Sequence, residues 1–121
     1  MSTKNTLVLG ASANPQRYSN LAMHRLSDHG HPVFAIGKRA GNVIDIPITT
    51  GTPPFKNVDT ITLYLNPTNQ KPYYDYILSL DPKRIIFNPG TENDELAEMA
   101  SKKGIQVMEA CTLVLLSTNQ Y

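Results

Sequence analysis

Short apolar runs alternate along this chain with segments of helical length. Runs bounded by glycine, proline or asparagine predict strands at residues 6–9, 32–36, 60–65, 84–87 and 105–108. Such alternation is typical of βαβ units, which build a parallel sheet. We therefore predict one α/β domain over residues 1–121, with a Rossmann-like, doubly wound, parallel five-stranded sheet and helices on both of its faces.

Helix start and stop signals separate these strands. Ser19 is a good N-cap, and Gly30 is well placed just beyond the end of a helix that runs to about His29. The next helix carries Tyr73, Ile77 and Leu80 at helical spacing, and Asp81-Pro82 ends it. A later helix opens at a capping box over residues 91–94 and buries Leu96, Met99 and Ala100, with Gly104 after its end. The apolar tail, residues 111–116, predicts a short final helix.

Residues 38–58 form the least regular segment. Pro47, Pro53 and Pro54 argue against a long helix there, and residues 43–46 are apolar enough for a short additional strand. The conformation of residues 40–58, and whether they close over a ligand, is left open by the sequence.

Composition narrows the range of functions. The net charge of +1 gives the molecule no overall attraction to nucleic acid or to an acidic membrane. Cys111 is the only cysteine, so neither an internal disulfide nor a thiolate metal site is expected, and the three histidines lack an accompanying carboxylate pattern. The first apolar run stops at Gly10, too early for a signal peptide or a membrane span, so we expect a cytoplasmic protein.

Polar loops follow the predicted strands at their carboxyl ends. In a doubly wound sheet these ends meet at one edge, where ligands of such folds bind. We expect this edge to hold a cofactor through the following residues: Gly10, Ala11, Ser12, Arg17, Tyr18, Ser19, Asn20, Gly37, Lys38, Arg39, Asn66, Pro67, Asn88, Pro89 and Gly90.

The first of these loops predicts an anion site. A glycine at a strand end, followed by a helix N-terminus, offers free backbone N–H groups and a favourable dipole, and Arg17 adds a planar cation. Gly10 fits the first position of the dinucleotide-binding fingerprint, but Ser12 and Pro15 replace its second and third glycines. An ordinary loop capped by Ser19 is the alternative interpretation.

The second loop favours a phosphorylated ribose. An NAD-binding domain usually carries an acidic residue near the end of its second strand, where this chain has Lys38 and Arg39. Two cofactors have the additional phosphate that these cations suit, NADP and coenzyme A (CoA). A solvated basic loop is the alternative. Glu92 and Asp94 would repel a phosphate at the later helix, so we assign the phosphates to the first helix.

Several of these motifs together resemble the small stand-alone CoA-binding proteins. The resemblance rests on residues 10–20, His29-Gly30-His31, Gly37-Lys38, residues 88–93 and residues 108–111, and it spans nearly the whole chain. It implies the nucleotide-binding fold of the succinyl-CoA synthetase α-subunit, with Ser12, Arg17, Ser19 and Lys38 facing the phosphates. Many relatives follow the second strand with asparagine and proline, which Gly37-Lys38-Arg39 replaces here. Nothing resembles the phosphohistidine domain of the synthetase.

Three functions follow from these features. The first is binding of CoA or an acyl-CoA by a carrier, sensor or delivery module without catalysis of its own. The second is a small NADP-dependent oxidoreductase. The third is a structural or interaction domain that docks on a partner or on a second copy of the chain, which would give a homodimer. No catalytic residue or metal ligand is predicted. Cys111 is either an inert thiol or, at the ligand edge, a partner for a mixed disulfide with the thiol of the ligand.

Overall fold

One seven-stranded sheet organises the chain in the computed structural model, which describes residues 3–121. The strands lie in the order β3-β4-β2-β1-β5-β6-β7, and all neighbouring pairs are parallel except β3 with β4. Their bounds are β1 (Thr6–Ala11), β2 (Val33–Gly37), β3 (Gly41–Val43), β4 (Ile46–Thr49), β5 (Thr60–Leu63), β6 (Arg84–Phe87) and β7 (Gln106–Glu109).

The prediction of five parallel strands is therefore wrong, because the sheet has seven strands and one pair, β3 with β4, is antiparallel. The predicted α/β class is correct. All five expected strands form, and the two additional ones, β3 and β4, come from the irregular segment. They make a hairpin whose turn, Ile44-Asp45, has positive φ at both residues. The single strand expected over residues 43–46 is in fact this turn with one residue on either side. Pro47 is tolerated because it lies in a short strand near the sheet edge.

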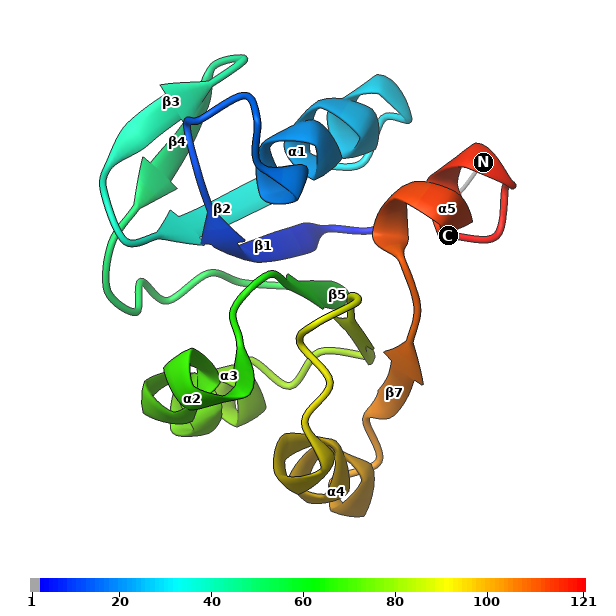
Figure 1. Ribbon diagram of the computed structural model, residues 1–121. Helices are drawn as coiled ribbons and strands as arrows, with labels where there is room; N and C mark the ends of the chain where they lie inside the picture. The colour runs from blue at the N-terminus through cyan, green and yellow to red at the C-terminus, as the bar shows by residue number, and fades with distance from the viewer. Residues whose placement is uncertain (1–2) are drawn as a thin grey trace.

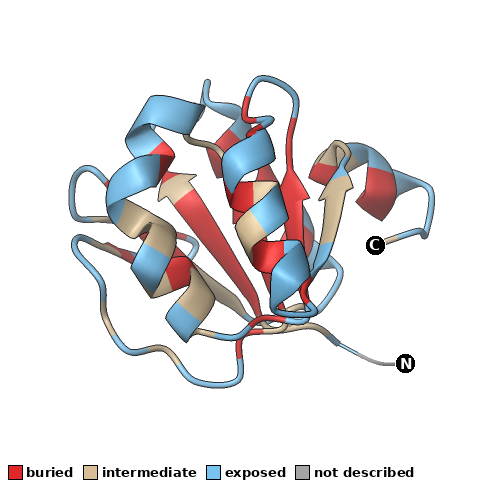
Figure 2. Cartoon of the chain, turned by 90° about the horizontal axis from the view of Figure 1, so that it is seen from below, coloured by how far each residue is buried: buried red, intermediate tan, exposed pale blue. Residues whose placement is uncertain are grey.

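Helices cover both faces of the sheet, as predicted (Figure 1). Their bounds are α1 (Tyr18–Asp28), α2 (Pro67–Gln70), the 3₁₀ turn η1 (Lys71–Tyr73), α3 (Tyr74–Ser79), α4 (Asp94–Lys102) and α5 (Thr112–Ser117). The helices α1 and α5 pack on one face with Val8, Met23 and Leu116, and α3 and α4 pack on the other with Ile77 and Leu96. The central strands are accordingly buried on both sides (Figure 2).

Three helix boundaries differ from the sequence prediction. The N-cap of α1 is Arg17, so Ser19 lies inside the helix. Asn93, and not Thr91, caps α4, since its Oδ1 accepts a hydrogen bond from the Leu96 N–H at 3.2 Å. The helix expected around Tyr73 is broken into α2, η1 and α3, because Pro72 lacks the N–H that a continuous helix needs.

The amino edge of the sheet carries a separate polar cluster. Arg84 is 8% exposed, donates from Nε to Thr60 Oγ1 at 3.0 Å and lies 4.3 Å from the centre of the Tyr121 ring. His31 accepts a hydrogen bond at Nδ1 from the Lys4 N–H at 3.0 Å, and its ring packs against that of Tyr121. Burial and the nearby Lys4 lower the pKa of His31 below its ordinary value. This cluster lies opposite the edge at which ligands are expected.

Candidate functional site

The strand order reverses direction between β1 and β5, which creates a switch point at the carboxyl edge. After β1, the chain adds β2 and then the β3–β4 hairpin on one side of β1. It then crosses back and adds β5 on the other side of β1. Crevices at such points are where open α/β sheets bind ligands. Gly10 lies at this place with φ +100°, and a Cβ there would lie 2.9 Å from the Tyr64 carbonyl carbon. The backbone therefore needs a glycine here for close packing of the two strand ends.

The loop between β1 and α1 is held by its own hydrogen bonds. Ser12 Oγ accepts from the Asn14 N–H at 3.1 Å, and Asn14 Oδ1 accepts from the Gln16 N–H at 3.0 Å. Asn20, buried in α1, donates from Nδ2 to the Ser12 carbonyl at 3.0 Å. These contacts fix the loop against the first turn of the helix. Asn20 thus acts inside the protein, as support for the loop between β1 and α1.

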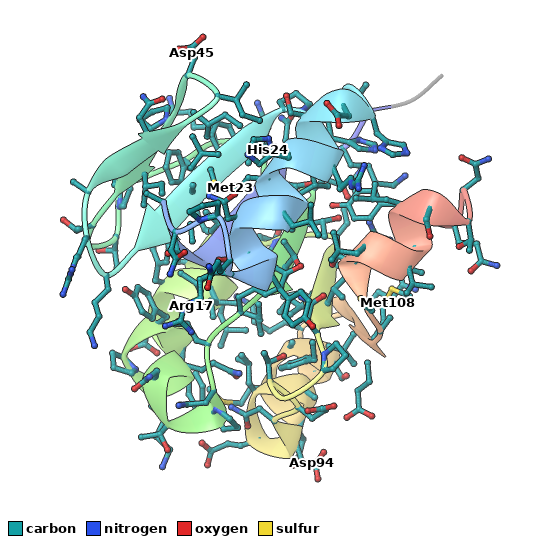
Figure 3. The ribbon with its side chains drawn as sticks, turned by 45° about the horizontal axis from the view of Figure 1, so that its top comes forward. Arg17, Met23, His24, Asp45, Asp94 and Met108 are labelled. Atoms are coloured by element: carbon teal, nitrogen blue, oxygen red, sulfur yellow. The ribbon has the colours of Figure 1, made fainter. Side chains whose placement is uncertain are left out.

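The start of α1 provides the geometry for an anion. The first backbone N–H groups of a helix have no acceptor within it, and they point outward together with the positive end of the dipole. No side chain caps this helix, and its first turn has no acidic residue. Arg17 is exposed at this end (Figure 3). Ser19 is 4% exposed, so its hydroxyl is less accessible than the sequence suggested.

The end of β2 places two cations beside this loop. Gly37 pairs with Ala11 in the register of β1 and β2, and a Cβ on Gly37 would lie 2.4 Å from the Ala11 carbonyl oxygen. Lys38 and Arg39 follow at once and are exposed. Among residues 3–121 the one ion pair joins Lys102 to Glu98, so both cations are free to meet an anionic ligand.

The loops after β5 and β6 complete the edge. Asn66, Pro67, Pro89 and Gly90 are all exposed there. Asn66 Oδ1 caps α2 by accepting from the Asn69 N–H at 2.9 Å. The Gly90 N–H donates to Glu92 Oε1 at 2.8 Å, which occupies the amide that a phosphate would otherwise use. This Gly90 N–H is therefore already paired within the protein.

Asn88 is buried, unlike the other residues predicted in these two loops. It is 3% exposed, and its Nδ2 donates to Thr62 Oγ1 at 2.7 Å and to the Leu63 carbonyl at 2.9 Å. Its Oδ1 accepts from the Thr112 N–H at 2.9 Å. The side chain joins β5, β6 and α5 beneath the edge. It therefore positions the edge from below and offers no free group to a ligand.

Gln70 is a positioning residue that the sequence reasoning missed. It is completely buried, and its Nε2 donates to the carbonyls of Leu65 and Thr91, both at 2.8 Å. Its Oε1 accepts from Asn93 Nδ2 at 2.8 Å. This one amide ties the loop after β5 to the loop after β6. A glutamine in a polar stretch between two prolines gives no sequence signal of such a role.

Two other groups lie near this edge. Burial raises the pKa of Tyr64 to about 12, so its phenol is even harder to ionise than that of an ordinary tyrosine. Cys111, the N-cap residue of α5, is a free and partly exposed cysteine. Over the described residues, no group of three or more histidine, cysteine, aspartate or glutamate side chains is placed to hold a metal ion. None of the helices in residues 3–121 combines the length and apolar character needed to cross a membrane.

Comparison with known proteins agrees with this architecture. The family model described as a CoA binding domain matches residues 4–117. An uncharacterized protein of known crystal structure is 49% identical, with full coverage of both chains and a TM-score of 0.97.

More distant structures share the fold alone. A hypothetical protein from Pyrococcus horikoshii OT3 is 22% identical over 96% of this chain and 83% of its own, with a TM-score of 0.86. A protein from Thermus thermophilus is 18% identical over 98% and 91%, with a TM-score of 0.85. None of the curated protein sequences matches this chain.

Proposed function

Because this chain belongs to the CoA binding domain family, we propose that it binds coenzyme A at the carboxyl edge of its sheet, at the switch point between β1 and β5. The diphosphate lies against the first turn of α1 and Arg17. The 3′-phosphate of the adenosine lies against Lys38 and Arg39. The exposed faces of Asn66, Pro67, Pro89 and Gly90 line the remainder of the ligand.

The observation that carries this proposal is the set of unpaired cations at one sheet edge. Arg17, Lys38 and Arg39 follow two neighbouring strands, whose last residues pair at Ala11 and Gly37. The whole molecule has a net charge of only +1, so this concentration of positive charge is local. Guanidinium and ammonium groups together with helix N–H groups suit a ligand with several phosphates.

We further propose that the protein carries, senses or delivers CoA and does not transform it. The groups that gather at this edge bind through charge and backbone N–H donors. The buried phenol of Tyr64, near this edge, has a pKa of about 12 and is a poor proton donor or acceptor at neutral pH.

Calorimetric titration with CoA, dephospho-CoA, NADP and NAD tests the proposal. We expect CoA to bind most tightly and dephospho-CoA about tenfold more weakly, because a charge-assisted contact to the 3′-phosphate contributes about 1.5 kcal/mol. Lys38→Ala should weaken the binding of CoA and leave that of dephospho-CoA unchanged, so that the difference between the two ligands becomes smaller. At a hundred times its dissociation constant, CoA should also stabilise the fold by about 2.7 kcal/mol.

Lys83→Ala is the matched control. Lys83 is exposed and precedes β6, at the opposite edge of the sheet, so its loss should leave the affinity for CoA unchanged. Binding of NADP without CoA would replace the proposal with the oxidoreductase alternative. Binding of none of the four ligands would overturn it in favour of an interaction domain.

A further inference from the structure

The helices α1 and α5 cover the same face of the sheet (Figure 1). Side chains of these helices line a groove between them. Its volume is about 470 Å³, within the range of small-molecule sites. Four of its lining side chains are apolar and two are basic: Leu21, Leu113, Val114, Leu116, Arg25 and His29.

The position of this groove connects it with the proposed CoA site. Both helices begin at the carboxyl edge, because α1 follows β1 and α5 follows β7. Leu21 is in the first turn of α1 and Val114 in the first turn of α5, so the apolar end opens at this edge. Arg25 and His29 lie one and two turns further along α1, so the basic end points away from it.

Most exposed large hydrophobic side chains of residues 3–121 belong to the two helices that form the groove. Of the four large hydrophobic residues that are exposed in residues 3–121, three belong to α1 or α5: Tyr18 at 75%, Leu21 at 38% and Val114 at 54%. Leu21 and Val114 line the groove, and exposed apolar side chains gathered at a groove mark a binding surface more often than a scattered set does. The fourth, Ile44, lies in the β3–β4 turn.

The basic end of the groove specifies the kind of ligand. Arg25 forms no ion pair with any carboxylate of residues 3–121. His29 shares a hydrogen bond with the Arg25 carbonyl at 2.8 Å through Nδ1, which leaves the other ring nitrogen outside this contact. An apolar channel that ends at an arginine fits a hydrocarbon chain with a terminal carboxylate.

On the premise of the proposed function, we infer that the groove between α1 and α5 binds the acyl part of an acyl-CoA, a chain of medium length with a carboxylate at its far end. The thioester lies at the carboxyl edge, beside Cys111 and the start of α5. The methylenes lie along Leu21, Leu113 and Val114. The terminal carboxylate meets Arg25.

Calorimetry with CoA, octanoyl-CoA and suberoyl-CoA tests this inference, since the two thioesters have eight-carbon chains that differ in the terminal group. Full burial of one methylene strengthens binding about fourfold, and this open groove should provide about half of that free energy. We therefore expect suberoyl-CoA to bind at least tenfold more tightly than CoA. It should also bind about tenfold more tightly than octanoyl-CoA, because of the charge-assisted contact.

Two variants test which side chains bind the acyl chain and its terminal carboxylate. Arg25→Gln should make suberoyl-CoA and octanoyl-CoA equal, and Val114→Asp should remove the advantage of suberoyl-CoA over CoA. Both side chains are exposed, so the fold should tolerate these changes, and neither should alter the affinity for CoA itself. Lys83→Gln, which removes a distant positive charge, should change nothing.

The inference is overturned if the three ligands bind equally, if octanoyl-CoA and suberoyl-CoA bind equally to the unaltered protein, or if Arg25→Gln keeps their ratio. In each of these cases CoA still binds, so the proposed function stands. Failure of all three ligands to bind would instead overturn the proposed function itself. A dimer that buries Val114 and is not dissociated by suberoyl-CoA would assign the groove to a second copy of the chain and overturn the inference.

Discussion

Replacing Asn88 with alanine removes the side chain that joins β5, β6 and α5. Three hydrogen bonds are lost, two from Nδ2 to Thr62 Oγ1 and the Leu63 carbonyl and one from the Thr112 N–H to Oδ1. Thr62 Oγ1 keeps its contact with Thr112 Oγ1 at 2.8 Å. The Thr112 N–H keeps no acceptor, because the first residue of a helix has none within the helix.

The free energy of unfolding should fall by about 3 kcal/mol. A buried hydrogen bond contributes about 1 kcal/mol, and a buried donor left without an acceptor costs about 1–3 kcal/mol. With a urea m-value of about 2 kcal/mol per M, the unfolding midpoint should fall by about 1.5 M at an unchanged slope. Equilibrium unfolding in urea, followed by circular dichroism, measures this shift.

Asn66→Ala is the matched control. Asn66 is also an asparagine at the carboxyl edge, but it is exposed and makes a single capping contact to the Asn69 N–H. Its replacement should cost about 1 kcal/mol. If Asn88→Ala costs no more than this control, the buried network does not contribute as we infer. Asn88→Asp should also destabilise the fold, since an oxygen would then face the Leu63 carbonyl; stability equal to the unaltered protein would refute the donor role of Nδ2.

Three further predictions concern the backbone and the pH dependence of stability. Gly37→Ala should lower the free energy of unfolding by about 3 kcal/mol, because its Cβ would lie 2.4 Å from the Ala11 carbonyl oxygen; an unchanged urea midpoint would contradict this. Ile44→Asn should stabilise the protein by about 1 kcal/mol, because a β-branched residue is strained at φ 49° in the hairpin turn, and a lower melting temperature would count against the explanation. The pKa of His31 lies below 6.5 in the folded protein, so the unfolded chain takes up its proton first and the free energy of unfolding should decrease as the pH falls below about 6.5. His31→Asn keeps an acceptor for the Lys4 N–H and should flatten this dependence in urea titrations at pH 5 to 7; an unaltered slope would refute the assignment to His31.

The local patterns of the chain predicted the elements that depend on near neighbours. The five apolar runs became β1, β2, β5, β6 and β7, and β1, β5 and β6 in the middle of the sheet are the most deeply buried of them. Gly30 and Gly104 follow α1 and α4 with φ +80°, as expected of residues just past a helix end. Arg17, Lys38 and Arg39 were placed at one edge from the order of strands and helices alone, because parallel strands direct their carboxyl ends the same way.

The irregular segment illustrates where local patterns fail. The β3–β4 hairpin depends on pairing of β4 with β2, and its turn uses Ile44-Asp45, without the asparagine or glycine by which such turns are recognised. Pro72 divides α2 from α3, although the spacing of Tyr73, Ile77 and Leu80 suggested one continuous helix. In the hairpin, tertiary pairing overrides the local preference, whereas the break at Pro72 has a local cause that the helical spacing of the apolar residues concealed.

The sequence by itself determined the α/β class, the edge that carries the loops and the residue types available for phosphate. Only the tertiary structure decided which polar side chains remain free for a ligand. Asn88 and Gln70 bond to partners at least 21 positions away along the chain, as well as to nearby backbone groups, while Lys38 and Arg39 remain exposed. Sequence spacing encodes the contacts of helices and turns, which are local. The partners of a buried amide are brought to it by the folding of the whole sheet, and no short segment of the chain contains that information.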